Sequence, residues 1–303
     1  MYRCYNPRRL GRLLVLDLCA VLLWLLGSTL SRSLQTSAEE PVELPVIMYH
    51  SITPTACTDY QLTPARFAED LCWLEAHGYE TVSVGELVAY TRGLGTLPAH
   101  PVLLTFDDGF YNNLSVALPL LEAHDMCAVV SIVGRYTQEA APLDPHADGY
   151  SYLTWEDVRT LQASGRIELG SHTYDLHALG ERRGCAVMDG EDPQHYRAVL
   201  TEDLMTLQAL YEKETGHAPA IFAYPYGFIS QESVPVLQEL GFVCTLTSRE
   251  QCNQIVQDPA CLYGLGRFNR DPALTSAQFF SKLSDQSIPA SASSRKGVFW
   301  YTQ

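Results

Sequence analysis

The segment Val102-Leu103-Leu104-Thr105-Phe106-Asp107-Asp108-Gly109 decides how the rest of this 303-residue chain is interpreted. Its first five residues form a short, almost continuously apolar run, which is typical of a strand buried on both faces of a parallel sheet. Two aspartates and a glycine follow at once. The segment therefore predicts a buried strand whose carboxyl end carries two carboxylates.

Similar apolar runs recur along the chain and alternate with predicted helices; they cover 46–49, 102–106, 128–133, 167–169, 221–224 and 242–246. The helices begin at recognisable caps, at Thr63 before a proline, at Ser83 with Glu86 three residues later, and at Thr154. The longest is expected over Pro193–Thr215. Repeated strand–helix units favour a parallel sheet with right-handed crossovers, and this length fits a barrel. We therefore expect an α/β fold with a single catalytic domain.

Polar residues follow the predicted strands at the point where each strand ends. Because the carboxyl ends of parallel strands share one rim of a barrel, these residues should converge there. Two imidazoles and one carboxylate can hold a divalent metal ion and leave a second carboxylate free as a base. Zinc is the first expectation, and iron, cobalt or nickel would also suit this donor set. The residues concerned are His50, Asp107, Asp108, His172, His177 and Tyr226.

Each of these motifs is weak when it is taken alone. Asp-Asp-Gly after a strand is often only a turn, because aspartate favours turns and glycine accepts a positive φ. His172 and His177 are five residues apart, which is not the spacing of one helical face. Tyr224-Pro225-Tyr226-Gly227 is by itself a good turn sequence. Their combination past successive strands is what indicates a hydrolase.

The chain resembles the polysaccharide deacetylases of carbohydrate esterase family 4, the NodB-homology family, from about Pro45 to Phe268. The resemblance implies a distorted (β/α) barrel of the polysaccharide deacetylase type. It also implies site roles for five residues. Asp107 of Thr-Phe-Asp-Asp-Gly would be the general base. Tyr226, the tyrosine of the Pro-Tyr-Gly motif, would offer its backbone N–H to the oxyanion. The ligands of one divalent metal ion would be Asp108, His172 and His177.

Three departures from the family pattern concern the acid and the base. One extra residue separates the two histidines of the His motif, and glycine and apolar residues stand where the Pro-Tyr-Gly motif of the family has an upstream arginine. The late histidine of the family is missing, since no histidine follows His217. These departures resemble the circularly permuted branch that includes poly-N-acetylglucosamine deacetylases, in which the histidine acid arrives on the first strand. This implies that His50 is the acid; the alternative is a buried histidine satisfied by backbone groups.

Arg267 lies near the expected end of a late strand, where it could replace the missing arginine as the partner of Asp107. The alternative for Arg267 is a surface salt bridge. Trp155, Tyr152 and Tyr174 could form an aromatic wall for a sugar ring, although aromatic residues serve more often for packing.

The termini differ in composition from the body. Residues 1–32 place four arginines before an apolar stretch, which predicts a signal peptide or an N-terminal membrane anchor; the alternative is a buried core helix. We expect a linker over 33–44, the deacetylase domain over 45–285 and a C-terminal tail over 286–303. The protein is then extracellular, at the cell surface or membrane-anchored.

The net charge of −15 and the nine cysteines restrict the partners and the compartment. An acidic chain lacks the basic face that a nucleic acid requires, so no nucleic-acid partner is expected. There is no Cys-x-x-Cys pair, which argues against a structural zinc site. Cys252 and Cys261 flank a short polar loop, and either a disulfide or two free thiols would fit.

The predicted reaction is metal-dependent removal of N-acetyl groups from a cell-surface or extracellular polysaccharide that contains N-acetylglucosamine. The expected partners are this acetylated polysaccharide and, through the N-terminal segment, a membrane. One alternative is an O-acetyl esterase acting on xylan or peptidoglycan. Another is a catalytically silent glycan-binding protein, although binding alone needs no metal site with a neighbouring base.

Overall fold

The structure is a computed structural model that describes residues 40–56, 58–140 and 146–285. Its centre is a parallel sheet with the strand order β10-β9-β8-β7-β6-β2-β12, and a short strand, β5, also pairs with β6. The expected α/β fold with parallel strands is confirmed. These strands are β2 (Val46–Tyr49), β5 (Glu80–Thr81), β6 (Pro101–Phe106), β7 (Ala128–Ile132), β8 (Ile167–Ser171), β9 (Ile221–Ala223), β10 (Cys244–Leu246) and β12 (Phe268–Asn269).

The segment that contains β12, at one end of this strand order, also bonds to β10 at the other end. Leu265 pairs in parallel with Leu246 of β10, and three residues later Phe268 pairs with Ile47 of β2. The N–H of Thr247 donates to the carbonyl of Leu265 at 2.8 Å. The sheet therefore curls into a distorted barrel, as the sequence predicted.

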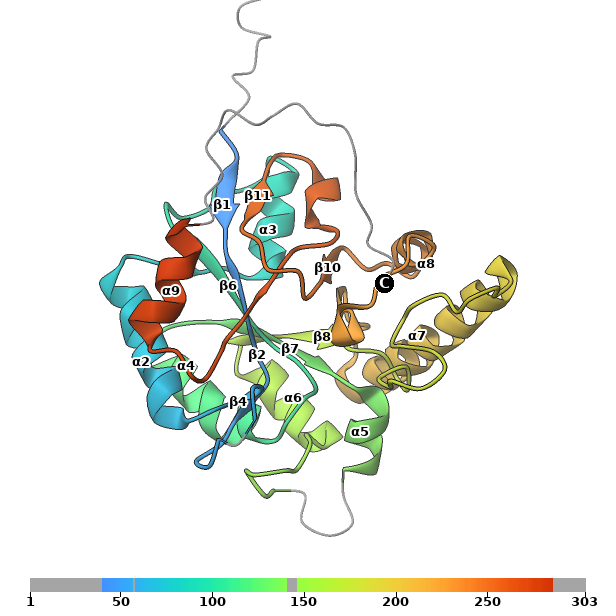
Figure 1. Ribbon diagram of the computed structural model, residues 1–303, viewed down its shortest axis with the longest axis horizontal. Helices are drawn as coiled ribbons and strands as arrows, with labels where there is room; N and C mark the ends of the chain where they lie inside the picture. The colour runs from blue at the N-terminus through green and yellow to red at the C-terminus, as the bar shows by residue number, and fades with distance from the viewer. Residues whose placement is uncertain (1–39, 57, 141–145, 286–303) are drawn as a thin grey trace, which may run out of the picture. The chain divides into compact units, whose positions relative to one another are not determined.

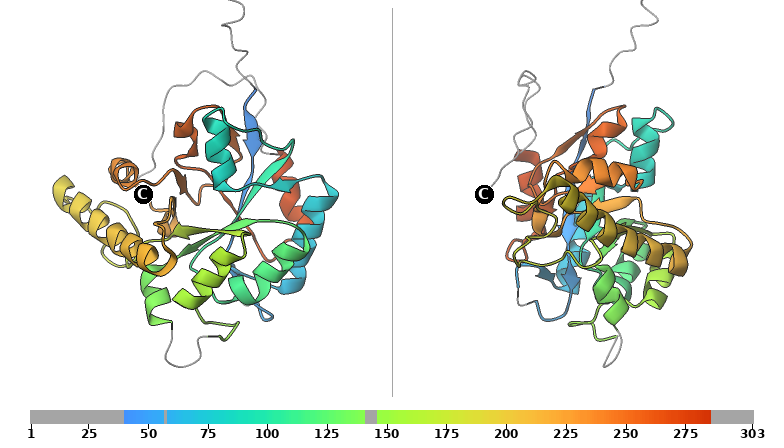
Figure 2. Two further views of the ribbon diagram at one scale, coloured as in Figure 1. Left: turned by 180° about the vertical axis from the view of Figure 1, so that it is seen from behind. Right: turned by 90° about the vertical axis from the view of Figure 1, so that its right-hand side faces the viewer.

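Helices surround the strands in all three views of the ribbon (Figures 1 and 2). In Figure 1, α2 and α9 lie on one side of the sheet, α5 and α6 below it, and α7 and α8 on the opposite side. The predicted caps are present, with side-chain caps at Thr63 and capping boxes at Ser83 and Thr154. The helices are α2 (Pro64–Ala76), α3 (Val84–Thr91), α4 (Leu118–Ala123), α5 (Gly134–Glu139), α6 (Trp155–Ala163), α7 (Pro193–Thr215), α8 (Ser233–Glu239) and α9 (Ser276–Asp285).

The side chains of β6 enter two apolar clusters, and all six residues of the strand are buried. Leu104 and Phe106 pack with residues of α2 and α4, whereas Leu103 packs with Val46 and Val129 of the neighbouring strands. Burial on both faces explains why the sequence of this strand is continuously apolar and does not alternate. The strand is therefore fixed on both sides, and so are the two aspartates that follow it.

Small elements complete the fold. Four are short strands: β1 (Val42–Leu44) pairs antiparallel with β11 (Asn253–Ile255), and β3 (Ser51–Ile52) pairs with β4 (Gln61–Leu62). A π-helical turn, η1, covers Asn113–Ala117, and the 3-10 turns η2 and η3 cover Pro225–Gly227 and Pro259–Leu262. Strand β1 lies inside the range 33–44 that the sequence predicted as a linker. For residues 42–44 the linker prediction is wrong, because they form a strand that pairs with β11.

The predicted leader over 1–32 and the predicted tail over 286–303 lie outside the described residues. Within the part of the chain that the structure describes, no helix is both long enough and apolar enough to cross a membrane. Cys252 and Cys261 are both free thiols, so the disulfide that the sequence left open is not formed between them.

Candidate active site

All six predicted site residues line one cavity of about 470 Å³ at the carboxyl ends of the strands. His50 follows β2, Asp107 and Asp108 follow β6, and the loop after β8 begins with His172. The parallel register of β2, β6, β7 and β8 places these strand ends side by side. Convergence of residues that are far apart in the sequence is thus a direct consequence of the sheet topology.

Asp108, His172 and His177 form a cluster whose ligand atoms all lie within 4.8 Å of one another. Oδ1 of Asp108 is 3.2 Å from Nε2 of His177 and 3.6 Å from Nε2 of His172. Among the described residues, it is the one group of three or more His, Cys, Asp or Glu side chains with this spacing. Two imidazoles and a carboxylate are the ligands of many catalytic zinc sites.

Three observations show that this donor set suits a divalent transition metal. Oδ1 of Asp108 is buried and has no hydrogen-bond partner among the described residues, which is costly unless another group binds it. Nδ1 of His172 lies 2.8 Å from the carbonyl of Ala223, so Nδ1 carries the hydrogen and the lone pair of Nε2 faces Asp108. Burial also lowers the pKa of His172, against the raising effect of Asp107 and Asp108, which favours the neutral imidazole that metals bind.

His177 is held differently from His172. The hydroxyls of Tyr136 and Tyr226 both lie 3.3 Å from its Nδ1. The sequence did not single out Tyr136, because a tyrosine in a short helix carries no local signal of function. Tyr226 has 45% of its surface exposed, so its ring forms part of the cavity rim.

Asp107 is paired with a buried arginine. The Arg267 guanidinium donates to both carboxylate oxygens at 2.7 and 2.8 Å, and its Nε donates to the carbonyl of Thr247 at 2.8 Å. Burial alone would raise the pKa of Asp107, but Arg267 and then His172 outweigh it, and the pKa lies well below its usual value. The suggested partnership is confirmed as a buried pair, so the surface salt bridge considered for Arg267 is wrong.

His50 has a fixed backbone and a free ring nitrogen. Its carbonyl accepts a hydrogen bond from Nδ2 of Asn113 at 2.9 Å, while its ring lies edge-on to Tyr60 with 4.8 Å between the centroids. Nδ1 of His50 is buried without a hydrogen-bond partner among the described residues. The alternative of a histidine satisfied by backbone groups therefore lacks the bond to Nδ1 that it would need.

Strained backbone concentrates at this cavity. Four non-glycine residues in the described chain have a positive φ. Two of them line the cavity, Asp108 at 71° and Tyr226 at 55°, and a third, Thr173 at 73°, directly follows His172. Thr173 is the most unusual, because a β-branched side chain is disfavoured in this region. Such strain persists only where the surrounding structure holds the residue, which is common at functional sites.

The predicted aromatic wall of Trp155, Tyr152 and Tyr174 is wrong in part. The Trp155 ring packs edge-on against Tyr211, and Tyr174 packs against the same apolar core. Tyr152 does lie near the site, between the rings of Phe110 and Tyr136. The aromatic side chains that line the cavity are Tyr60, Phe110, Tyr224 and Tyr226.

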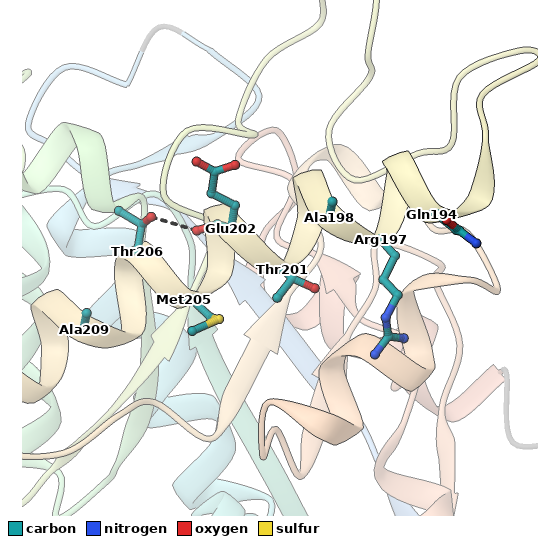
Figure 3. Close-up of a pocket in the computed structure, with 8 residues that line it drawn as sticks. All are labelled: Gln194, Arg197, Ala198, Thr201, Glu202, Met205, Thr206 and Ala209. Atoms are coloured by element: carbon teal, nitrogen blue, oxygen red, sulfur yellow. Dashed lines mark hydrogen bonds between the residues drawn. The ribbon is translucent and has the colours of Figure 1, made fainter.

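A second hollow, of about 760 Å³, follows the outer face of α7 (Figure 3). Its lining contains Arg197, Glu202 and Met205 among small and uncharged residues, with no histidine, cysteine or aspartate. The figure shows these side chains along one helix, and Thr206 donates to the carbonyl of Glu202 at 2.7 Å. This face offers a single carboxylate, that of Glu202, whereas the cavity at the strand ends holds a three-residue cluster of potential metal ligands and a second carboxylate.

A curled parallel sheet with paired carboxylates and two histidines at its carboxyl rim defines the class of (β/α) barrels that carry a set of potential metal ligands. Residues 95–245 match the sequence model of the polysaccharide deacetylase family. The chain belongs to this family, and the resemblance drawn from its motifs is confirmed.

Two curated relatives are poly-β-1,6-N-acetyl-D-glucosamine N-deacetylases. That of Escherichia coli strain K12 is 26% identical over 217 residues, which cover 65% of this chain and 32% of the relative. That of Staphylococcus aureus strain N315 is 22% identical over 183 residues, which cover 60% of this chain and 59% of the relative. The chain thus spans about a third of the length of the E. coli protein.

Solved structures support the fold. A de-N-acetylase from Aggregatibacter actinomycetemcomitans superposes with a TM-score of 0.69 at 22% identity, covering 80% of this chain and all of that one. IcaB from Ammonifex degensii superposes with a TM-score of 0.65 at 26% identity, covering 79% of this chain and 96% of that one. The predicted deacetylase-type barrel is therefore confirmed.

Proposed function

We propose that this protein is a metal-dependent hydrolase that removes N-acetyl groups from an N-acetylglucosamine polymer outside the cell. The observation that carries the proposal is the separation of roles within one cavity. Asp108, His172 and His177 face one point, while Asp107 is turned to Arg267 and kept apart from that cluster. The relatives from two bacterial species support poly-β-1,6-N-acetylglucosamine as the first substrate to test.

The three-residue cluster is expected to hold one divalent ion, with zinc as the first candidate. When bound there, such an ion supplies Lewis-acid chemistry, polarising a carbonyl and making water a stronger acid. The protein supplies the orientation of the donors, because Ala223 fixes the ring of His172 and the tyrosine hydroxyls contact His177.

The remaining groups move protons and stabilise charge. Asp107, ionised because Arg267 holds its pKa low, takes the proton of the attacking water. The backbone N–H of Tyr226, in a left-handed turn, donates to the oxyanion of the tetrahedral intermediate. His50 in its protonated form then donates to the departing amine, which is a poor leaving group unless it is protonated.

A catalytically silent glycan-binding protein is less well supported. Arg267 and Asp107 are both fully buried, and desolvating two charges is costly even when they pair. A surface that only binds sugars gains nothing from such a pair beside a set of metal ligands. An O-acetyl esterase would use the same groups, so substrate comparison must separate it from an N-deacetylase.

Purified full-length protein tests the proposal when its metal content and its acetate release are measured together. We expect chelator-sensitive release of acetate from β-1,6-linked N-acetylglucosamine oligomers, with less from peptidoglycan and acetylxylan. Acetate from acetylxylan alone would identify an O-acetyl esterase. Absence of both metal and acetate release, with retained oligomer binding, would favour the glycan-binding alternative.

A His50→Ala variant is expected to keep its fold and metal while it loses most activity on N-acetyl substrates, by a factor on the order of a hundred or more. An activated O-acetyl ester should suffer much less, because its leaving group needs little protonation. Rates on both substrates distinguish the roles. Equal losses would assign His50 to orientation of the substrate, and wild-type rates on both would remove it from the mechanism.

A further inference from the structure

The segment from Thr173 to His177 connects the two histidines of the cluster and belongs to no helix or strand. It begins with a backbone conformation that threonine disfavours, at a φ of 73°. Nothing in its own sequence keeps His177 turned toward Asp108. The position of this ligand must therefore be imposed by the groups that hold the segment from outside.

Helix α5 holds the segment by donating two backbone hydrogen bonds to carbonyl groups of the segment. The N–H of Gly134 donates to the carbonyl of Thr173, and the N–H of Arg135 donates to that of Tyr174, both at 2.9 Å. A side chain at Gly134 would lie 2.7 Å from Cδ1 of Leu207 and 2.9 Å from Cδ2 of Tyr174. The close approach of α5 therefore requires glycine here.

Asp203 of α7 holds the same segment by accepting hydrogen bonds from two backbone N–H groups of the segment. Oδ1 of Asp203 accepts from the N–H of Tyr174 at 2.8 Å, and Oδ2 accepts from the N–H of Asp175 at 2.7 Å. The loop is thus bonded from two sides. Helix α5 donates to carbonyl groups of the loop, and Asp203 accepts from N–H groups of the loop. Figure 1 shows the two helices as neighbours, and the contact of Gly134 with Leu207 places them together.

The surroundings of Asp203 indicate that holding the loop is its role. The side chain is buried and makes no ion pair with any described arginine, lysine or histidine. Burial raises its pKa to about 6, although the N–H groups of Asp175 and Tyr174 act to lower it. At pH 7 it is therefore a buried carboxylate, which is costly unless hydrogen bonds compensate it. The bonds that do so come from the histidine loop.

We propose that Asp203 is a positioning residue for the metal site, whose carboxylate fixes the loop so that Nε2 of His177 lies against Asp108. The inference rests on the proposed metal-dependent function and adds to it a residue from a different helix. Asp203 acts through the backbone of Tyr174 and Asp175 and touches neither substrate nor metal. Its loss should weaken metal binding before it affects the rest of the barrel.

The test compares Asp203→Asn with the wild-type protein. An asparagine offers one acceptor oxygen, so one of the two loop N–H groups loses its partner. We expect the Kd for Zn²⁺, measured by chelator competition, to rise roughly 10- to 100-fold, as when other outer partners of metal ligands are removed. Amide hydrogen exchange of Tyr174 and Asp175, measured without metal, should become faster. Glu202→Gln, at the neighbouring exposed position, is the matched control and should change neither quantity.

An unchanged Kd together with unchanged exchange in Asp203→Asn would overturn the inference. Faster exchange with a wild-type Kd would overturn it too, because the loop would then move without affecting the ligand. If Asp203→Asn does not fold, Asp203→Glu decides, since it keeps the charge but displaces both acceptors. A raised Kd of Asp203→Glu for Zn²⁺ supports the proposal, and a wild-type Kd of this variant refutes it. A wild-type protein that binds none of Zn²⁺, Fe²⁺, Co²⁺ and Ni²⁺ would refute the proposed function itself. The exchange rates of Tyr174 and Asp175 would still test whether Asp203 holds the loop.

Discussion

Asp107→Asn is expected to abolish turnover while metal stays bound, with a loss of about 10²- to 10⁴-fold in rate. The carboxylate is proposed to accept the proton of the attacking water, and an amide cannot do so at neutral pH. The side chain faces Arg267 at 2.7 and 2.8 Å and is not part of the Asp108 cluster. Metal analysis beside a rate assay on acetylated oligomers measures the two effects separately.

The control for this variant is Asp125→Asn, which neutralises a carboxylate whose side chain is 87% exposed. It should leave both rate and metal content unchanged. Asp107→Asn also removes the charge that pairs with buried Arg267, so thermal unfolding is measured alongside and the assay is run well below the melting temperature. A normal rate in folded Asp107→Asn would show that Asp107 is not the base.

Removal of any one metal ligand is expected to lower bound metal and activity together. Changes to groups that merely support a ligand cost 10- to 100-fold in affinity, so loss of a ligand should cost more than about 100-fold. We expect turnover to fall to the background rate in Asp108→Ala, His172→Ala and His177→Ala. Metal occupancy after dialysis and acetate release provide the two measurements.

His100→Ala is the matched control, because it removes an exposed imidazole that lies outside the cavity. It should keep full metal content and full rate. Retention of full occupancy by all three ligand variants would show that the ion, if one is present, binds elsewhere. Loss of metal with retained activity would show that the reaction does not depend on it.

Much of the fold could be predicted from the sequence because it depends on local properties of the chain. The apolar run before Asp107 specifies a strand buried on two faces wherever it is placed. The caps at Ser83 and Thr154 begin helices through bonds to residues three positions away. Once parallel strands were expected, the convergence of His50 and Asp107 at one rim followed from topology alone.

The partners of the site residues were decided by the tertiary structure. Arg267 and Asp107 are 160 residues apart, and only the segment that bonds to both β10 and β2 brings the guanidinium to the carboxylate. The sequence suggested this pair but could not separate it from a surface salt bridge. From the sequence, Trp155 could have formed part of an aromatic wall for a sugar ring. Its ring instead packs against Tyr211, because the contact with α7 determines its direction.

Asp203 also illustrates the difference between what the sequence predicts and what the tertiary structure decides. In the sequence it is an acidic residue within a long helix, beside an exposed glutamate of the same charge. Helical periodicity can place such a residue on a face, but it cannot say that two loop amides will lie against that face. The sequence by itself therefore determined the strands, the helix starts and the residue types at the rim, since neighbours along the chain carry that information. Which groups hold those residues in place was decided only by the tertiary structure, because hydrogen bonds between distant segments depend on the path of the whole chain.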